Sequence, residues 1–173
     1  MPSMMIIVLM PLLATAVYTD IRWARIPNWL TVSVMGVGIF AHAWLGGLQG
    51  IGCSLAGLGM GLGLFLLPYA CKAIGAGDVK LMAAIGAIVG LSGVISVAAL
   101  SVLVGGVYAL GAMSYQWGLA VTSRKLVGVT YGALVTGGET GIQELRLPFK
   151  LRYGLAIAAG TLLFLGGVQP FGG

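Results

Sequence analysis

The stretch "LMAAIGAIVGLSGVISVAALSVLVGGVYALGAMSYQ", residues 81–116, contains no charged side chain. A helix needs about 20 apolar residues to cross a bilayer, so this stretch is long enough for more than one crossing. Together with the two residues before it, we divide it into predicted spans at 79–91 and 93–116. The same reading of the rest of the chain gives four more apolar segments, at 3–19, 28–46, 51–71 and 153–169. The sequence therefore predicts an all-α, polytopic membrane bundle of about six transmembrane helices.

The composition supports a protein embedded in the lipid bilayer. The chain is 59% hydrophobic and 8% charged, whereas an ordinary soluble domain has about 25% charged residues. The net charge of +5 comes from basic residues spread over several loops, so we expect no nucleic-acid partner. Cys53 and Cys71 have neither the spacing of a zinc site nor a CxxC motif, so no metal and no cofactor is expected.

The distribution of charge predicts the orientation of the bundle. With six spans, every basic residue lies on one side of the membrane, and the loops at 47–50 and 92 carry no charge. The positive-inside rule makes the basic side cytoplasmic, so both termini are expected on the opposite side. The first segment is not expected to be a cleaved signal peptide, because its basic residues, Arg22 and Arg25, follow it rather than precede it.

Two other stretches invite an interpretation. In "AGLGMGLGL" (56–64), Gly57 with Gly61 and Gly59 with Gly63 have the spacing of small residues at which helices pack closely in lipid. We favour close packing over a flexible helix that admits substrate. The segment 117–150 contains an amphipathic part with a basic pair. Its role is open at this point between a cover for an active site, a partner contact and a solvated linker.

Two aspartates at predicted helix ends are the candidate catalytic groups. Asp20 ends the first segment and Asp78 begins the fourth, and both are predicted at the cytoplasmic edge of the membrane. Ionisable groups there are costly, which favours a function. Taken singly, Asp78 could be a helix N-cap and Asp20 a partner of Arg22 or Arg25. Two acids that arrive at one depth from different helices favour an acid/base pair instead.

The chemistry expected of such a pair is that of an aspartic protease. One ionised carboxylate takes a proton from water, and the protonated partner donates a hydrogen bond to the peptide carbonyl. The helix dipole favours Asp78, at a helix N-terminus, as the ionised base and Asp20 as its protonated partner. Gly75 and Gly77 would let an extended substrate backbone approach Asp78.

Three blocks of sequence resemble the type IV prepilin peptidases. "GAGDVKLMAAIGAIVG" (75–90) contains the GxGD signature and is similar to the second catalytic block of that family. "DIRWARIPNWLT" (20–31) resembles the first block, and "LPFKLRYGLAIAAGTL" (147–162) is similar to the last span. The order of the blocks is also that of the family. The resemblance implies catalysis by Asp20 and Asp78.

The resemblance also implies the substrate and the cellular location. Members cut the basic leader from prepilins and related pseudopilins at the cytoplasmic face of the bacterial inner membrane, with the lipid bilayer as their surroundings. Lys80, Pro27 and Asn28 match the motifs and are expected to have accessory or structural roles. The chain is expected to be a single membrane-embedded domain over 1–173, without a zinc or N-methyltransferase domain, like the short, protease-only Flp/Tad type.

Two functions of another kind compete with the peptidase. A small proton-coupled transporter or channel could use the same aspartates as proton relays, and it predicts acids near the membrane centre. A scaffold of a pilus machine with inactive motifs is the second. His42, in the second segment and far from the acids, is expected to be an interfacial or packing residue.

Overall fold

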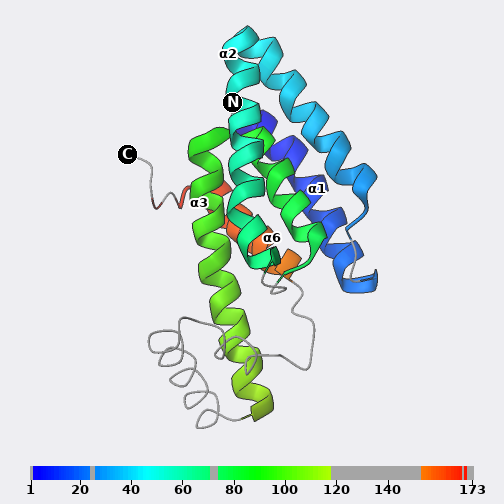
Figure 1. Cartoon of the computed structure of the whole chain (residues 1–173), viewed down its shortest axis with the longest axis vertical. Helices are drawn as coiled ribbons and strands as arrows, with labels where there is room; N and C mark the ends of the chain where they lie inside the picture. The colour runs from blue at the N-terminus through cyan, green and yellow to red at the C-terminus, as the bar shows by residue number, and fades with distance from the viewer. Residues whose placement is uncertain (1, 24–25, 71–73, 118–152, 169, 171–173) are drawn as a thin grey trace. The chain divides into compact units, whose positions relative to one another are not determined.

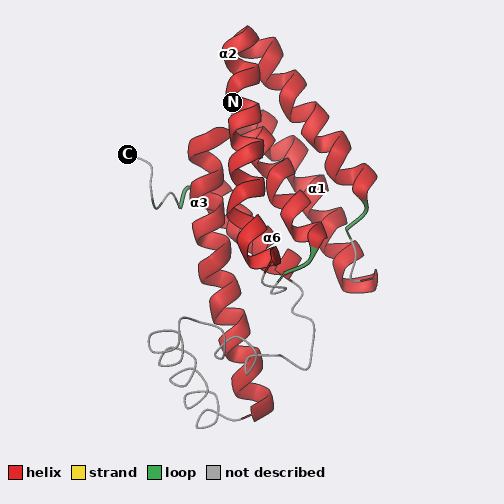
Figure 2. Cartoon of the chain, in the orientation of Figure 1, coloured by secondary structure: helices red, strands yellow, loops and turns green. Residues whose placement is uncertain are grey.

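A computed structural model describes residues 2–23, 26–70, 74–117, 153–168 and 170, and every regular element in these ranges is a helix (Figure 2). The all-α prediction is therefore confirmed. Figure 1 shows the helices α1 (Pro2–Trp23), α2 (Asn28–Ala70), α3 (Ala76–Trp117) and α6 (Tyr153–Leu165). The predicted interfacial part of 117–150 lies outside the described residues, apart from the last residue of α3.

The chain divides into two compact units. The first consists of Met1–Gly105 with Arg152–Gly173, and the second is Gly106–Leu151, of which the structure describes the end of α3, Gly106–Trp117. The first unit contains Asp20 and Asp78, so the candidate site lies entirely within it.

Each of the two long helices is broken at a glycine. In α2, Gly47 has φ 55° and ψ −137°, and in α3, Gly90 has φ 75° and ψ −174°. Positive φ angles are open to glycine at little steric cost, which explains why the breaks fall at these residues. Both helices double back at their breaks (Figure 1). The break in α2 lies in the predicted 47–50 loop, and that in α3 lies next to the loop predicted near residue 92.

Three helices of the described part are long and apolar enough to cross a membrane. They are Ile6–Trp23 of α1, Asn28–Ala70 and Ala76–Ala112, and Tyr153–Leu165 is a shorter apolar helix. This confirms that the chain suits a membrane. Because α2 and α3 are each counted as one helix across their breaks, the number of membrane-capable helices is three, and the six crossings that the sequence predicts are not confirmed.

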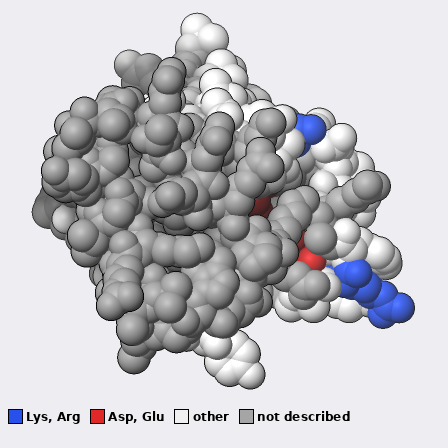
Figure 3. Space-filling model, turned by 60° about the horizontal axis from the view of Figure 1, so that its bottom comes forward, with Lys and Arg blue, Asp and Glu red and all other residues white. Residues whose placement is uncertain are grey.

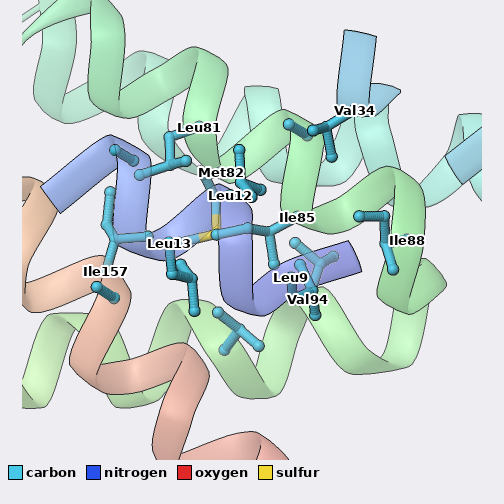
Figure 4. Close-up of a cluster of buried hydrophobic side chains, with 14 of the residues drawn as sticks. Leu9, Leu12, Leu13, Val34, Leu81, Met82, Ile85, Ile88, Val94 and Ile157 are labelled. Atoms are coloured by element: carbon cyan, nitrogen blue, oxygen red, sulfur yellow. The ribbon is translucent and has the colours of Figure 1, made fainter. Parts of the chain in front are cut away.

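The first half of α3 is the centre of the core. Every residue from 81 to 90 is buried, as expected of a helix that is apolar on all sides. Its Leu81, Met82 and Ile85 pack with side chains of α1, α2 and α6 in one cluster (Figure 4). Asp78 lies in the first turn of the same helix, three residues before this buried run, and the packing therefore fixes the position of the backbone that carries it.

Close backbone contact holds α2 against α3. A Cβ atom added to Gly57 would collide with the carbonyl oxygen of Gly86, and one added to Gly61 would lie 2.6 Å from the carbonyl oxygen of Met82. Close packing is thus confirmed for these two glycines. It is wrong for Gly59 and Gly63 within the described residues, because a Cβ atom there meets nothing within 4 Å. The reason is geometric, since the second pair lies on another face of the helix.

A hydrogen bond reinforces this helix contact. The Ser54 hydroxyl of α2 donates to the Ala87 carbonyl of α3 over 2.7 Å, and Ser54 is fully buried. From the first half of α2, Gly38 lies against the same carbonyl, where an added Cβ atom would be 2.8 Å from the oxygen. Both halves of α2 therefore contact the central part of α3.

Candidate active site

Asp20 and Asp78 are both buried at helix ends. Asp20 lies in the last turn of α1 and Asp78 in the first turn of α3, and each is 7% exposed. Carboxyls are seldom buried without a reason, because removing a charge from water is costly. Their burial therefore distinguishes these two side chains from ordinary surface acids.

The Asp78 carboxylate helps to begin α3. Its Oδ2 accepts a hydrogen bond of 3.0 Å from the backbone N–H of Gly75, and the Asp78 N–H donates to the Gly75 carbonyl over 3.1 Å. An acid at the third helical position that binds back to the capping N–H forms half of a capping box. Asp78 is thus not the N-cap residue itself, which was the alternative from sequence; α3 begins at Ala76, before it.

Two contacts join the region after α1 to the head of α3. The buried Ile26 packs on Gly77, where an added Cβ atom would lie 3.2 Å from the Cβ atom of Ile26. The ammonium group of Lys80 donates to the side-chain oxygen of Asn28 over 2.9 Å. The two sequence blocks that carry Asp20 and Asp78 therefore meet in the fold. Pro27 lies between Ile26 and the start of α2 and is half-buried.

The head of α6 reaches the Asp20 carboxyl. A Cβ atom added to the buried Gly154 would lie 2.8 Å from the Asp20 Oδ2 atom and 3.3 Å from its carboxyl carbon. The preceding residue, Tyr153, packs its ring on Phe65 of α2 with 6.0 Å between ring centres.

Acidic and basic atoms lie near one another at one face of the molecule. In Figure 3, red acidic atoms are visible on the face at the bottom of Figure 1, with blue basic atoms near them. In the part of the chain that the structure describes, Asp20 and Asp78 are the acidic residues, and Arg22 and Lys80 are the basic ones.

Arg22 has neighbours on its own helix. Its guanidinium donates to the Tyr18 hydroxyl over 3.1 Å and lies 5.7 Å from the centre of the Trp23 ring. These contacts hold the cation along α1. Arg25, the other partner suggested for Asp20 from sequence, lies outside the described residues, as does Cys71.

His42 lies at the other end of α3, beside the helix breaks. Its Nδ1 atom donates to the Gly38 carbonyl over 3.0 Å, so the ring is held against its own helix. With Gln49, Cys53, Gly90 and other residues it lines a groove of about 590 Å³. Gly90 is twelve positions beyond Asp78, roughly 18 Å along the helix axis. His42 is therefore well separated from both carboxyls.

Together these features define a protein whose described residues form apolar helices suited to a membrane, and in which two motif blocks meet. The model of the type IV leader peptidase family matches residues 7–110, which include both aspartates. The chain belongs to the type IV leader peptidase family, and it is a peptidase of that general kind. No curated protein and no solved structure matches it.

Sequence reasoning did not single out Tyr153 or Gly154. Both residues lie in the third block, 147–162, whose likeness to the last span of the family implies no role for either residue. A glycine at the start of an apolar segment reads as a packing residue. Only the fold reveals that this one lies against a carboxyl.

Proposed function

We propose that the protein is an intramembrane aspartyl endopeptidase that removes the leader of type IV prepilins or pseudopilins of the Flp kind. Its family supplies the peptidase activity, and prepilins are the substrates of that family in general. The observation that carries the aspartic mechanism is the meeting of the two motif blocks. The Ile26–Gly77 contact and the Lys80–Asn28 hydrogen bond tie the surroundings of Asp20 to those of Asp78.

In the proposed mechanism, a water molecule lies between the two carboxyls. Asp78 takes a proton from the water as its oxygen attacks the scissile carbonyl carbon, and protonated Asp20 donates a hydrogen bond to the carbonyl oxygen. We assign the base to Asp78 because its carboxylate accepts the Gly75 N–H at a helix N-terminus, where negative charge is stabilised. Collapse of the tetrahedral intermediate breaks the C–N bond, and the leaving amine takes a proton from the carboxyl pair.

The membrane topology that suits this reaction has six crossings. At about 1.5 Å per residue, the 43 residues of α2 would span roughly 65 Å, about twice the hydrocarbon core. The breaks at Gly47 and Gly90 supply the two reversals that six crossings need. We place the protein in the bacterial inner membrane as a single embedded domain, with the aspartates at the cytoplasmic face and both termini periplasmic.

The remaining motif residues have supporting roles in this proposal. Gly75 and Gly77 give the substrate backbone access beside Asp78, although Ile26 already occupies one side of Gly77. Lys80 and Asn28 join the heads of α3 and α2 through their hydrogen bond, and Pro27 ends the connection before α2. These roles concern the shape of the site rather than proton transfer.

Co-expression with a Flp-type prepilin tests the function. Loss of the leader is followed as a mobility shift and by mass spectrometry of the new N-terminus. Asp20→Asn and Asp78→Asn should each lower the cleavage rate at least about a hundredfold, the usual share of general acid–base catalysis. His42→Ala, at the far end of α3, is the matched control and should cleave normally. Full-rate cleavage by either asparagine variant would reject the paired-carboxylate mechanism, whereas failure of the wild type to cleave would leave the proton-relay alternative to be examined.

A further inference from the structure

We propose that Gly154 is a positioning residue, whose missing side chain leaves the space in which the Asp20 carboxyl is held, while Tyr153 anchors the helix head that provides this space. The inference rests on the proposed function, because it gives a reason for the placement of one catalytic group. The carboxyl of Asp20 lies over the bare backbone of Gly154, and any larger residue there would occupy its position.

The distances indicate which atoms would move. A Cβ atom at position 154 would lie 2.8 Å from Oδ2, 3.3 Å from Cγ and 3.5 Å from Cβ of Asp20. The two closest atoms thus belong to the carboxyl group, at the end of a side chain that can rotate, and only the Asp20 Cβ atom is in ordinary contact. An alanine at 154 would therefore displace the carboxyl with little effect on the helix backbones.

The contacts of the neighbouring residue, Tyr153, explain why the start of α6 cannot move away from Asp20 instead. The Tyr153 ring packs on Phe65, and its hydroxyl donates to the Ser101 carbonyl over 3.4 Å. It also fills the space beside Gly105, where an added Cβ atom would lie 2.6 Å from the ring. Contacts with both α2 and α3 thus fix the start of α6, and a larger residue at 154 has to act on Asp20.

Another contact of α6, at Gly93 of α3, gives a control variant. Gly93 of α3 is buried, and a Cβ atom there would lie 2.8 Å from the Cβ atom of Val89 and 3.3 Å from the Phe164 ring of α6. Gly93→Ala therefore crowds α6 against α3, away from both carboxyls, whereas Gly154→Ala crowds α6 against Asp20 of α1. A purely structural role of Gly154 predicts that the two variants behave alike.

The first measurement is cleavage of a purified prepilin by each variant in detergent, with the folded fraction measured by gel filtration. Gly154→Ala should lower kcat about tenfold to a hundredfold with KM within about threefold, since misplacing a reacting group by about an ångström costs this much. Gly93→Ala should retain kcat per folded molecule. Equal losses in the two variants, or a normal kcat for Gly154→Ala, would overturn the assignment.

The second measurement does not depend on cleavage. The infrared band of the Asp20 carboxyl, identified by its loss in Asp20→Asn, should shift in Gly154→Ala and stay in place in Gly93→Ala. A shifted band in a protein whose wild type cuts no prepilin would preserve the positioning role and reject the proposed function. An unshifted band would reject the positioning role whatever the activity.

A double-mutant cycle covers the case in which Gly154→Ala folds poorly. Removing the carboxyl with Asp20→Ala removes the two atoms nearest to the added methyl group. The Tm lost in Gly154→Ala should therefore be largely recovered in the double variant Asp20→Ala/Gly154→Ala. A double variant as unstable as the single glycine variant would show that the methyl group acts elsewhere and would overturn the proposal.

Discussion

The contact between α2 and α3 makes a sharp prediction about two glycines that look equivalent in sequence. In Gly57→Ala, the new methyl group would collide with the carbonyl oxygen of Gly86 and lie 2.8 Å from the carbonyl carbon of Gly90. These are backbone atoms, which cannot rotate away, so the helices have to separate. In Gly59→Ala, two positions along, the methyl group meets nothing within 4 Å in the described part of the chain.

The magnitude follows from comparing the two variants. Alanine is favoured over glycine within a helix by about 0.5–1 kcal/mol, and both variants gain this amount. Their difference in unfolding free energy therefore reports the packing cost alone, which for an overfilled contact is about 1–3 kcal/mol. We expect Gly59→Ala to be slightly more stable than the wild type and Gly57→Ala to be less stable than Gly59→Ala by this difference.

The assay is reversible unfolding in mixed micelles with increasing sodium dodecyl sulfate, followed by circular dichroism. Each variant is compared with the wild type in the same detergent. Equal unfolding midpoints for the two alanine variants would contradict the packing argument. The same result would show that α2 does not approach α3 through the face that carries Gly57 and Gly61.

Two further predictions concern the ends of the bundle. The Lys80–Asn28 hydrogen bond is exposed to solvent, so it should contribute little to stability. A double-mutant cycle with Lys80→Met and Asn28→Ala, measured in the same unfolding assay, should give a coupling energy below about 1 kcal/mol. A value several times larger would mean that this bond holds the two motif blocks together on its own. Cys53 is an exposed thiol in the groove beside the helix breaks. In a Cys71→Ser variant, which removes the other thiol, a membrane-impermeant maleimide should label Cys53 from the periplasmic side of intact spheroplasts. Labelling only after the membrane is opened would contradict the proposed orientation.

Much of the fold could be predicted because membrane helices follow from apolar runs and glycine positions. All six predicted segments begin or end within a few residues of a helix end or break; the second, for example, is predicted at 28–46, and α2 begins at Asn28 and breaks at Gly47. Every predicted segment lies largely within a helix. The number of crossings is harder to establish, because the two halves of α2, like those of α3, follow one another without an intervening loop, and length alone counts each pair as one helix.

The site was predictable only in part. Asp20 and Asp78 stand out because charge is rare in this chain, and their burial fits that expectation. The contacts that surround them involve residues with no chemical signal, such as Ile26 on Gly77 and Gly154 on Asp20. The sequence does not reveal which of many glycines faces a carboxyl, because that depends on the rotation of α6 about its axis.

The bare-backbone contact between α2 and α3 also has a consequence for the evolution of such proteins. A contact made by side chains can drift, since a larger residue on one helix is offset by a smaller one on the other. Gly57 and Gly86 have no side-chain atoms that could be made smaller, so a larger residue at one position cannot be offset by a smaller one at the other. In related chains we therefore expect these two positions to stay fixed over long divergence, while Gly59 and Gly63 vary freely with the lipids that surround them.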